Sequence, residues 1–208
     1  MRISALTTLV FIGLVGCGGN DHDAISEMPL EPEASPPEKT IGEWFVDNED
    51  GTVTDQRTGI QWMRCDIGQT WTGRGCRDTP RGEKNSFGFT KDGGFYDARD
   101  NVRELNFAGH DDWRLPSYRQ LKTIVYCSSG RPDFYPDRSQ GECAGDYSSP
   151  TIDTSVFPNA YAGWFWTTTD CPREWGGGQH CKAFVNFRNS GPWAGSLGTL
   201  GRARAMRR

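Results

Sequence analysis

Cysteine is the residue type with the clearest chemistry in this chain, which contains seven of them. Cys17 stands apart because it closes an apolar run, from Ala5 to Val15, in the order Leu14-Val15-Gly16-Cys17. That run is shorter than the ~20 apolar residues that span a bilayer. A small residue before such a cysteine is typical of a bacterial lipobox, so residues 1–16 are predicted to be a lipoprotein signal peptide.

Cys17 is therefore the predicted lipidation site, with the membrane as a partner through N-terminal acyl chains. Stable attachment needs more than one acyl chain. The resemblance to bacterial lipoproteins implies three on this cysteine. Gly18 follows, with no aspartate at the next position. By resemblance to Gram-negative lipoproteins, this favours the outer membrane, on its periplasmic or its surface face. An ordinary signal peptide with a chance cysteine is the alternative.

The other six cysteines are predicted to form disulfide bonds, because an even count in an exported chain is typical of an oxidising compartment. Many connectivities are open, and we favour sequential pairing because each consecutive pair flanks a turn-rich segment. The alternative is zinc, but no Cys-x-x-Cys occurs, and we expect neither a metal nor another cofactor. The six are Cys65, Cys76, Cys127, Cys143, Cys171 and Cys181.

Histidine offers little for catalysis in the part of the chain after residue 40. His110 precedes two aspartates, and His180 is next to Cys181. Neither arrangement forms a recognisable set of nucleophile, base and orienting group. We therefore expect a non-catalytic protein.

Tryptophan and arginine are the candidate ligand-binding residues. Among the eight tryptophans, Trp71, Trp175 and Trp193 lie between glycines and prolines and are expected to be exposed, with Trp175 the strongest candidate. The others are expected to belong to the core, since each buries a large area; they are Trp44, Trp62, Trp113, Trp164 and Trp166. Near the end of the chain, Arg202, Arg204 and Arg207 alternate with other residues and are predicted to form a basic patch on the solvent face of a last strand.

Composition divides the chain into three parts. After the signal peptide, residues 17–40 hold the acylated cysteine and a proline-rich, acidic stretch without aromatic residues, which predicts a disordered tether. Residues 41–208 suit a single domain. In that domain basic and acidic residues are equally numerous, which argues against nucleic acid as a partner.

The elements expected to position these residues are mixed. Residues 45–65 predict a hairpin around Asp50-Gly51. Residues 95–106 predict an amphipathic helix, and Ser117 with Gln120 predicts a capped second helix that ends near residue 127. Residues 71–94 read mostly as loop, whereas residues 163–169 and 184–187 predict strands.

The order of motifs resembles that of the Lcl C-terminal domain family, which closes the Legionella collagen-like adhesin. The matching motifs cover about residues 44–207 and are Asp-Asn-x-Asp-Gly-Thr-Val-Thr-Asp from Asp47, Thr58-Gly59-Ile60-x-Trp62, Asp112-Trp113-Arg114-Leu115-Pro116, Trp164-Phe165-Trp166-Thr167-Thr168 and the terminal Arg-x-Arg. The resemblance implies an α+β, C-type-lectin-like fold: two helices, a small twisted antiparallel sheet and long disulfide-stapled loops. It also implies surface adhesion, with sulfated polysaccharide as the ligand of the named adhesin.

The sequence thus predicts a surface or envelope lipoprotein with a lectin-like adhesion domain that binds a glycan, sulfated or not. One alternative is an assembly module that docks a partner protein of the envelope. Another is a degenerate enzyme of the formylglycine-generating type, whose Arg-Leu-Pro segment before a helix resembles residues 114–116. The oligomeric state is not predicted.

Overall fold

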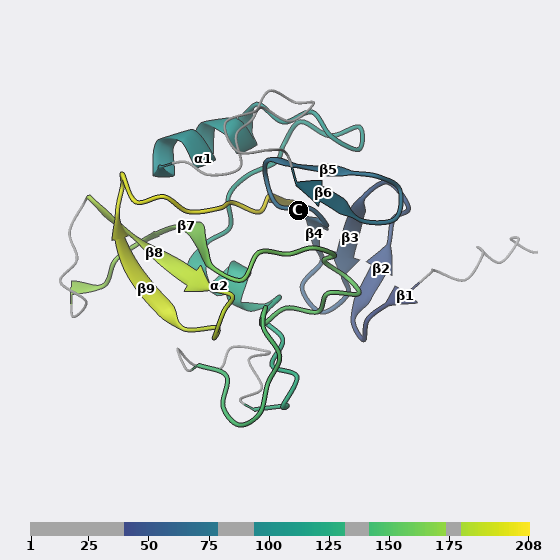
Figure 1. Cartoon of the computed structure of the whole chain (residues 1–208). Helices are drawn as coiled ribbons and strands as arrows, with labels where there is room; N and C mark the ends of the chain where they lie inside the picture. Colours follow the sequence, from purple (N-terminus) through teal and green to yellow (C-terminus); the bar gives the residue numbers. More distant parts are fainter. Residues whose placement is uncertain (1–39, 79–93, 132–141, 174–179) are drawn as a thin grey trace, which may run out of the picture. The chain divides into compact units, whose positions relative to one another are not determined.

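The computed structural model describes residues 40–78, 94–131, 142–173 and 180–208, which lie in one compact unit. These residues form ten strands in three antiparallel sheets, together with two helices (Figure 1). The strands are β1 (Thr40–Ile41), β2 (Phe45–Asp47), β3 (Thr52–Asp55), β4 (Ile60–Met63), β5 (Gln69–Trp71), β6 (Cys76–Asp78), β7 (Trp164–Asp170), β8 (Cys181–Asn186), β9 (Pro192–Ser196) and β10 (Met206–Arg207). The helices are α1 (Phe95–Arg103) and α2 (Tyr118–Lys122).

The first sheet has the strand order β1-β2-β3-β4-β10 and contains the predicted hairpin. Gly51 permits the turn between β2 and β3 because its φ of 91° lies in the region that favours glycine. The same residue is closely packed: a Cβ there would lie 2.8 Å from the ring of Trp71. The Asp-Gly pair thus shapes the turn and lets the β5–β6 hairpin pack against it.

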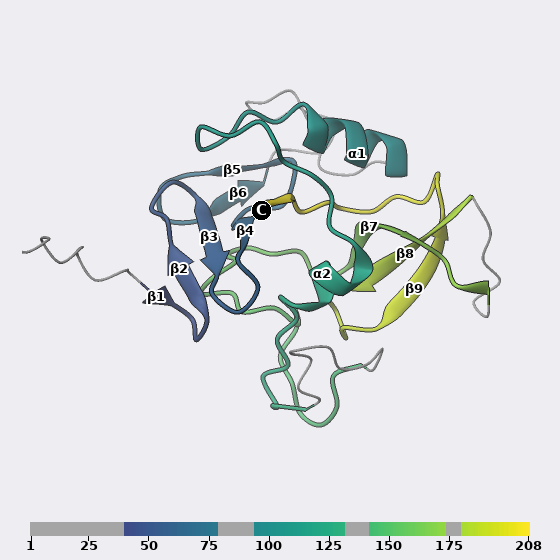
Figure 2. The same ribbon diagram turned by 180° about the vertical axis from the view of Figure 1, so that it is seen from behind.

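The third sheet has the strand order β7-β8-β9 (Figures 1 and 2). Its apolar residues belong to two different cores. On one face Phe165, Val185 and Phe187 pack in a core with Leu121 of α2. On the other face Trp166 and Phe184 pack in a second core. The α1 residues of that second core are Phe95, Ala98 and Val102. The sheet is therefore covered by different elements on its two sides.

Both helices begin as predicted and end early. In α2 the capping box is present: Ser117 Oγ accepts the Gln120 N–H at 3.3 Å, and Gln120 Oε1 accepts the Ser117 N–H at 2.8 Å. The helix nevertheless stops at Lys122, because the following chain turns to pair with another segment. Val125 forms a β-bridge with Ile152, and the Tyr126 N–H donates to the Thr151 carbonyl.

The expected α+β, C-type-lectin-like fold is wrong for the described residues, which are mostly β. The two helices contain only nine and five residues, whereas ten strands form three sheets. The physical reason lies partly in segments read as loop. Residues 69–78 form the β5–β6 hairpin, in which Cys65–Cys76 and the side chain of Gln69 supply the order that local sequence periodicity did not reveal.

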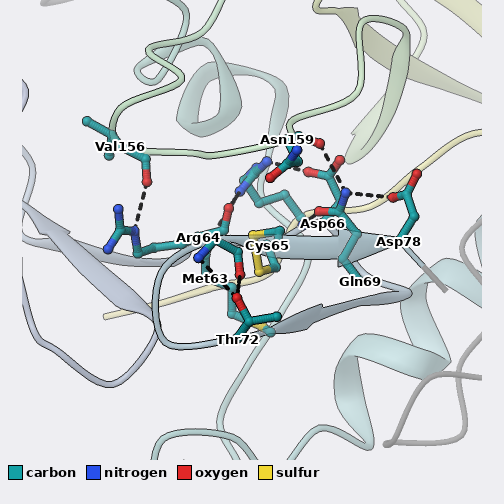
Figure 3. The surroundings of a disulfide bond; sticks show 12 residues. Met63, Arg64, Cys65, Asp66, Gln69, Thr72, Asp78, Val156 and Asn159 are labelled. Atoms are coloured by element: carbon teal, nitrogen blue, oxygen red, sulfur yellow. Dashed lines mark hydrogen bonds and ion pairs between the residues drawn. A yellow bond between two sulfur atoms is a disulfide. The ribbon is translucent and has the colours of Figure 1, made fainter.

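Three disulfides join the six cysteines in sequential order, Cys65–Cys76, Cys127–Cys143 and Cys171–Cys181. The first fixes the β5–β6 hairpin to the end of β4 (Figure 3). The last joins Cys171, directly after β7, to Cys181, the first residue of β8. This is the sequential pairing favoured because each pair flanks a turn-rich segment.

Candidate functional site

Two exposed indole rings stack on each other at the surface of the β7–β9 sheet. The rings of Trp164 and Trp193 have centroids 4.3 Å apart and planes only 5° from parallel. Trp164 is 38% exposed and Trp193 is 41% exposed. Each ring thus covers one face of the other, yet both side chains keep more than a third of their surface exposed.

The strand register brings these two rings together. Trp164 of β7 is opposite Asn186 of β8, and Trp193 of β9 is opposite Phe184 of the same strand. Cross-strand partners lie on the same face of a sheet, so both indoles project from one face and meet over β8. Phe184 supports Trp193 from beneath, with ring centroids 6.0 Å apart.

This stack continues a buried aromatic row. Trp166 packs on Phe184 at 4.0 Å between centroids, and Phe95 of α1 packs edge-on against Trp166 at 5.5 Å. Two glycines keep the row close to the backbone, since a Cβ at Gly195 or Gly201 would lie 2.3 Å or 2.7 Å from the Phe184 ring. The exposed pair therefore rests on a rigid, fully packed base.

The tryptophan predictions have mixed outcomes. Trp62, Trp113 and Trp166 are buried, and Trp193 is exposed, as expected. Trp44 and Trp164 were expected in the core, but they are 42% and 38% exposed. Trp164 lies on the same face of β7 as Trp166. The core that α1 forms on this face includes Trp166 but does not reach Trp164, which is therefore exposed. Trp175, the preferred ligand-facing residue, lies outside the described residues.

Trp71, the other tryptophan expected at the surface, is half-buried. The guanidinium of Arg64 lies 4.6 Å from the centre of its ring. Trp71 thus helps to pack the β5–β6 hairpin.

The predicted basic patch at the end of the chain is wrong for two of its three arginines. Arg202 is buried, and Arg204 has no exposed surface. Arg204 pairs with Asp66 and donates through Nη1 to the carbonyls of Met63 at 2.9 Å and Arg64 at 2.7 Å. These side chains organise the interior and do not lie on a solvent face.

Asp66 is the acceptor around which this interior network is built. Its second oxygen faces Arg202 Nη1 at 3.4 Å and accepts the Tyr161 N–H at 3.1 Å. Burial raises the pKa of the Asp66 carboxyl, and the two guanidinium groups oppose that rise. Burial likewise lowers the pKa of Arg204. Asp66 was not predicted as a functional residue, because its only distinguishing feature in the sequence is its place directly after Cys65.

Gln69 extends the network to the neighbouring hairpin (Figure 3). Its Nε2 donates to Asp78 at 2.8 Å and to the Asn159 carbonyl at 3.0 Å, while its Oε1 accepts the Asp66 N–H at 2.9 Å. Each polar group of this amide therefore has a partner. The hairpin is held against the loop that leads into β7.

Arg207, the third predicted patch residue, is half-buried at the edge of the first sheet. Its Nε donates to Asp112 at 2.6 Å, and its Nη1 donates to Gln61 at 2.7 Å. The backbone of Arg114 pairs with Met206 nearby. The Asp-Trp-Arg-Leu-Pro motif and the terminal arginines thus meet at β10.

The candidate catalytic and metal residues do not converge in the part of the chain that the structure describes. His110 packs near Trp113, with ring centroids 6.5 Å apart. Cys181, next to His180, is held in a disulfide. Among the described residues no three His, Cys, Asp or Glu side chains lie together as metal ligands, and no helix there has the length and apolar character needed to cross a membrane.

The arrangement defines a class of protein: a disulfide-bonded, mostly β domain that displays an aromatic surface on a rigid sheet. The family model of the Lcl C-terminal domain matches residues 51–204, so the chain belongs to that family. It thereby contains an adhesin-related domain. Among curated proteins, none matches the sequence.

Proposed function

We propose that this chain is a lipid-anchored envelope protein whose folded domain is a non-catalytic adhesion module. In this proposal Cys17 carries the acyl chains, residues 17–40 form the tether, and the Trp164–Trp193 stack contacts the ligand. The observation that carries the proposal is the stack itself, since two large aromatic side chains are held against each other and are still exposed.

Binding energy at protein surfaces is concentrated in a few residues, and tryptophan is enriched among them. A tryptophan that is already held in place loses little side-chain freedom when a ligand binds. Trp164 and Trp193 hold each other, and Phe184 supports Trp193. The pair is therefore pre-organised for contact.

The chemistry of the cysteines supports binding over catalysis. An enzyme of the formylglycine-generating type needs reactive thiols, whereas all six cysteines of the domain are paired in disulfides. A paired sulfur is neither a nucleophile nor a thiolate ligand for a metal. This observation favours the adhesion module.

The binding role is tested with the full-length chain in micelles of a detergent without a sugar headgroup. The protein is applied to an array of immobilised glycans and envelope proteins, alongside Trp193→Ala and Trp44→Ala. Trp44 is a matched control because it is equally exposed but lies before β2. We expect Trp193→Ala alone to lose about tenfold or more in affinity. Equal binding by both variants would contradict the proposal.

The anchor is tested separately by cell fractionation. We expect the wild-type chain in the outer-membrane fraction and Cys17→Ala in the soluble fraction, because the acyl chains supply the attachment. Membrane association of Cys17→Ala would show that the anchor lies elsewhere.

A further inference from the structure

We propose that the Trp164–Trp193 stack binds an uncharged carbohydrate, with the C–H face of a pyranose ring packed on the exposed indole surface. This inference rests on the proposed function and names its ligand class. The proposed ligand differs from a sulfated polymer, whose binding needs clustered cations on the protein. The argument has three parts: the shape of the surface, its charge and its neighbouring polar groups.

The shape of the surface fits a sugar ring. A pyranose has a flat, apolar C–H face and a rim of hydroxyl groups, so it matches an aromatic ring that is open on one side. The rings of Trp164 and Trp193 are within 5° of parallel and their side chains are 38% and 41% exposed, so apolar ring surface remains available for such a contact. Aromatic side chains offer this apolar area together with a polar N–H at the rim.

The charge of the surroundings argues against a polyanion. The arginines that follow β9 are turned inward, where Arg204 and Arg202 face Asp66. On β8, Lys182 pairs with Asp170 at 2.5 Å. Arg188 is exposed in the turn after β8, and Arg173 is exposed after β7, at the other end of this antiparallel pair; two guanidinium groups separated in this way supply little affinity for a sulfated polymer. The cations of this sheet are thus engaged within the domain or isolated.

The polar neighbour of the stack suits hydroxyl groups. Asn186 lies opposite Trp164 on the same face, and its side chain is half-buried. Its Oδ1 accepts the Arg188 N–H at 3.0 Å, which fixes the orientation of the amide. An oriented amide beside an aromatic ring is the combination that small-molecule sites use: apolar contact for affinity and a few placed polar groups for specificity.

The test compares neutral and sulfated probes on the full-length chain, again in a detergent without a sugar headgroup. The neutral probes are hexasaccharides of glucose, galactose and N-acetylglucosamine, and the sulfated probes are heparin and dextran sulfate. Binding is measured by calorimetry at about 50 mM and about 500 mM NaCl, since salt screens only the ionic contribution. The variants are Trp193→Ala, Trp193→Phe, Arg188→Ala and Trp44→Ala.

We expect at least one neutral probe to bind with an affinity that changes by less than about twofold between the two salt concentrations. Trp193→Ala should weaken it by about tenfold or more, and Trp193→Phe should restore most of it. Arg188→Ala and Trp44→Ala should bind like the wild type. Near-ultraviolet circular dichroism and thermal unfolding of each variant establish that it is folded.

Two outcomes would overturn the ligand class while leaving the proposed function intact. One is binding to sulfated probes alone, with affinity lost at high salt and in Arg188→Ala. The other is binding to a protein on the array, but to no glycan, that is lost in Trp193→Ala. Two further outcomes would overturn both: ligand binding by Trp193→Ala equal to wild type, or a wild-type dimer that Trp193→Ala converts to a monomer, because a second copy would then cover the stack.

Discussion

Arg204 and Asp66 form an ion pair in which both side chains have no exposed surface. Arg204 also lies over the ring of Phe157, with its guanidinium carbon 4.6 Å from the ring centre. Its Nη1 donates to two carbonyls just before Asp66 in the chain. The terminal Arg-x-Arg of this chain therefore supplies the cations that pair with Asp66 in the interior of the domain.

Replacement of Arg204 by methionine should destabilise the domain strongly. Arg204→Met removes the main partner of a buried carboxylate and leaves two carbonyls without their donor, a loss of about 3–5 kcal/mol. The free energy of unfolding in urea measures the effect. Arg188→Met, at an exposed position, is the control and should change it by less than about 0.5 kcal/mol. Similar values for the two variants would refute a structural role for Arg204.

Loss of the first disulfide should weaken the domain without changing its fold. The Cys65–Cys76 bond closes a short loop with a sequence separation of 11, and removing it should cost about 3 kcal/mol on the chain-entropy model. The double variant Cys65→Ser/Cys76→Ser, unfolded thermally beside the wild type, measures the loss. An unchanged melting temperature would mean that Gln69 and Asp66 hold the hairpin alone.

The buried Lys122 should make stability rise with pH. Burial lowers the pKa of Lys122 from 10.5 to about 8, and its Nζ donates to the Ser190 carbonyl at 2.7 Å. Above about pH 8 the folded chain has released a proton that the unfolded chain retains, so the free energy of unfolding increases with pH.

Between pH 8 and pH 10 the gain should reach about 2 kcal/mol. Lys122→Met should lack this rise, and the difference between the two urea-unfolding series isolates it from other groups. Above pH 10, Tyr118 acts in the opposite direction, because burial raises its pKa to about 12. Parallel curves for wild type and Lys122→Met below pH 10 would contradict the lowered pKa.

Local chemistry predicted the parts of the fold that depend on neighbouring residues. The Asp50-Gly51 turn and the Ser117 cap depend on residues within a few positions along the chain, and the paired cysteines are only 10 to 16 residues apart. All of these features are present. The helix starts are of this kind too. Their ends are not, because α2 stops where Val125 pairs with the distant Ile152.

The misses concern contacts between remote segments. The alternation of Arg202 and Arg204 is typical of the solvent-exposed face of a strand. Both side chains instead pair with Asp66 in the interior, and Asp66 is distant in the sequence. Trp164 looked like a core residue, yet the second core that α1 shares with Trp166 does not include it. Periodicity along one segment cannot show which face another segment covers.

For the two tryptophans of the stack, one prediction of side-chain exposure is confirmed and the other is wrong. Trp193 was predicted at the surface because glycine and proline surround it, whereas Trp164 was assigned to the core from its strand of large apolar residues. Only the register across β8 shows that the two rings meet. A site formed by side chains of two strands that lie on either side of a third strand cannot be predicted from the sequence of either strand alone.

The most direct test of the central claim is fluorine NMR of the full-length chain labelled with 5-fluorotryptophan. Each resonance is assigned by a Trp→Phe variant, and the glycan or protein that binds on the array is then titrated in. The resonances of Trp164 and Trp193 should shift together, while those of the buried Trp62, Trp113 and Trp166 stay in place. A titration that shifts Trp44 or Trp175 and leaves Trp164 and Trp193 unchanged would contradict the account.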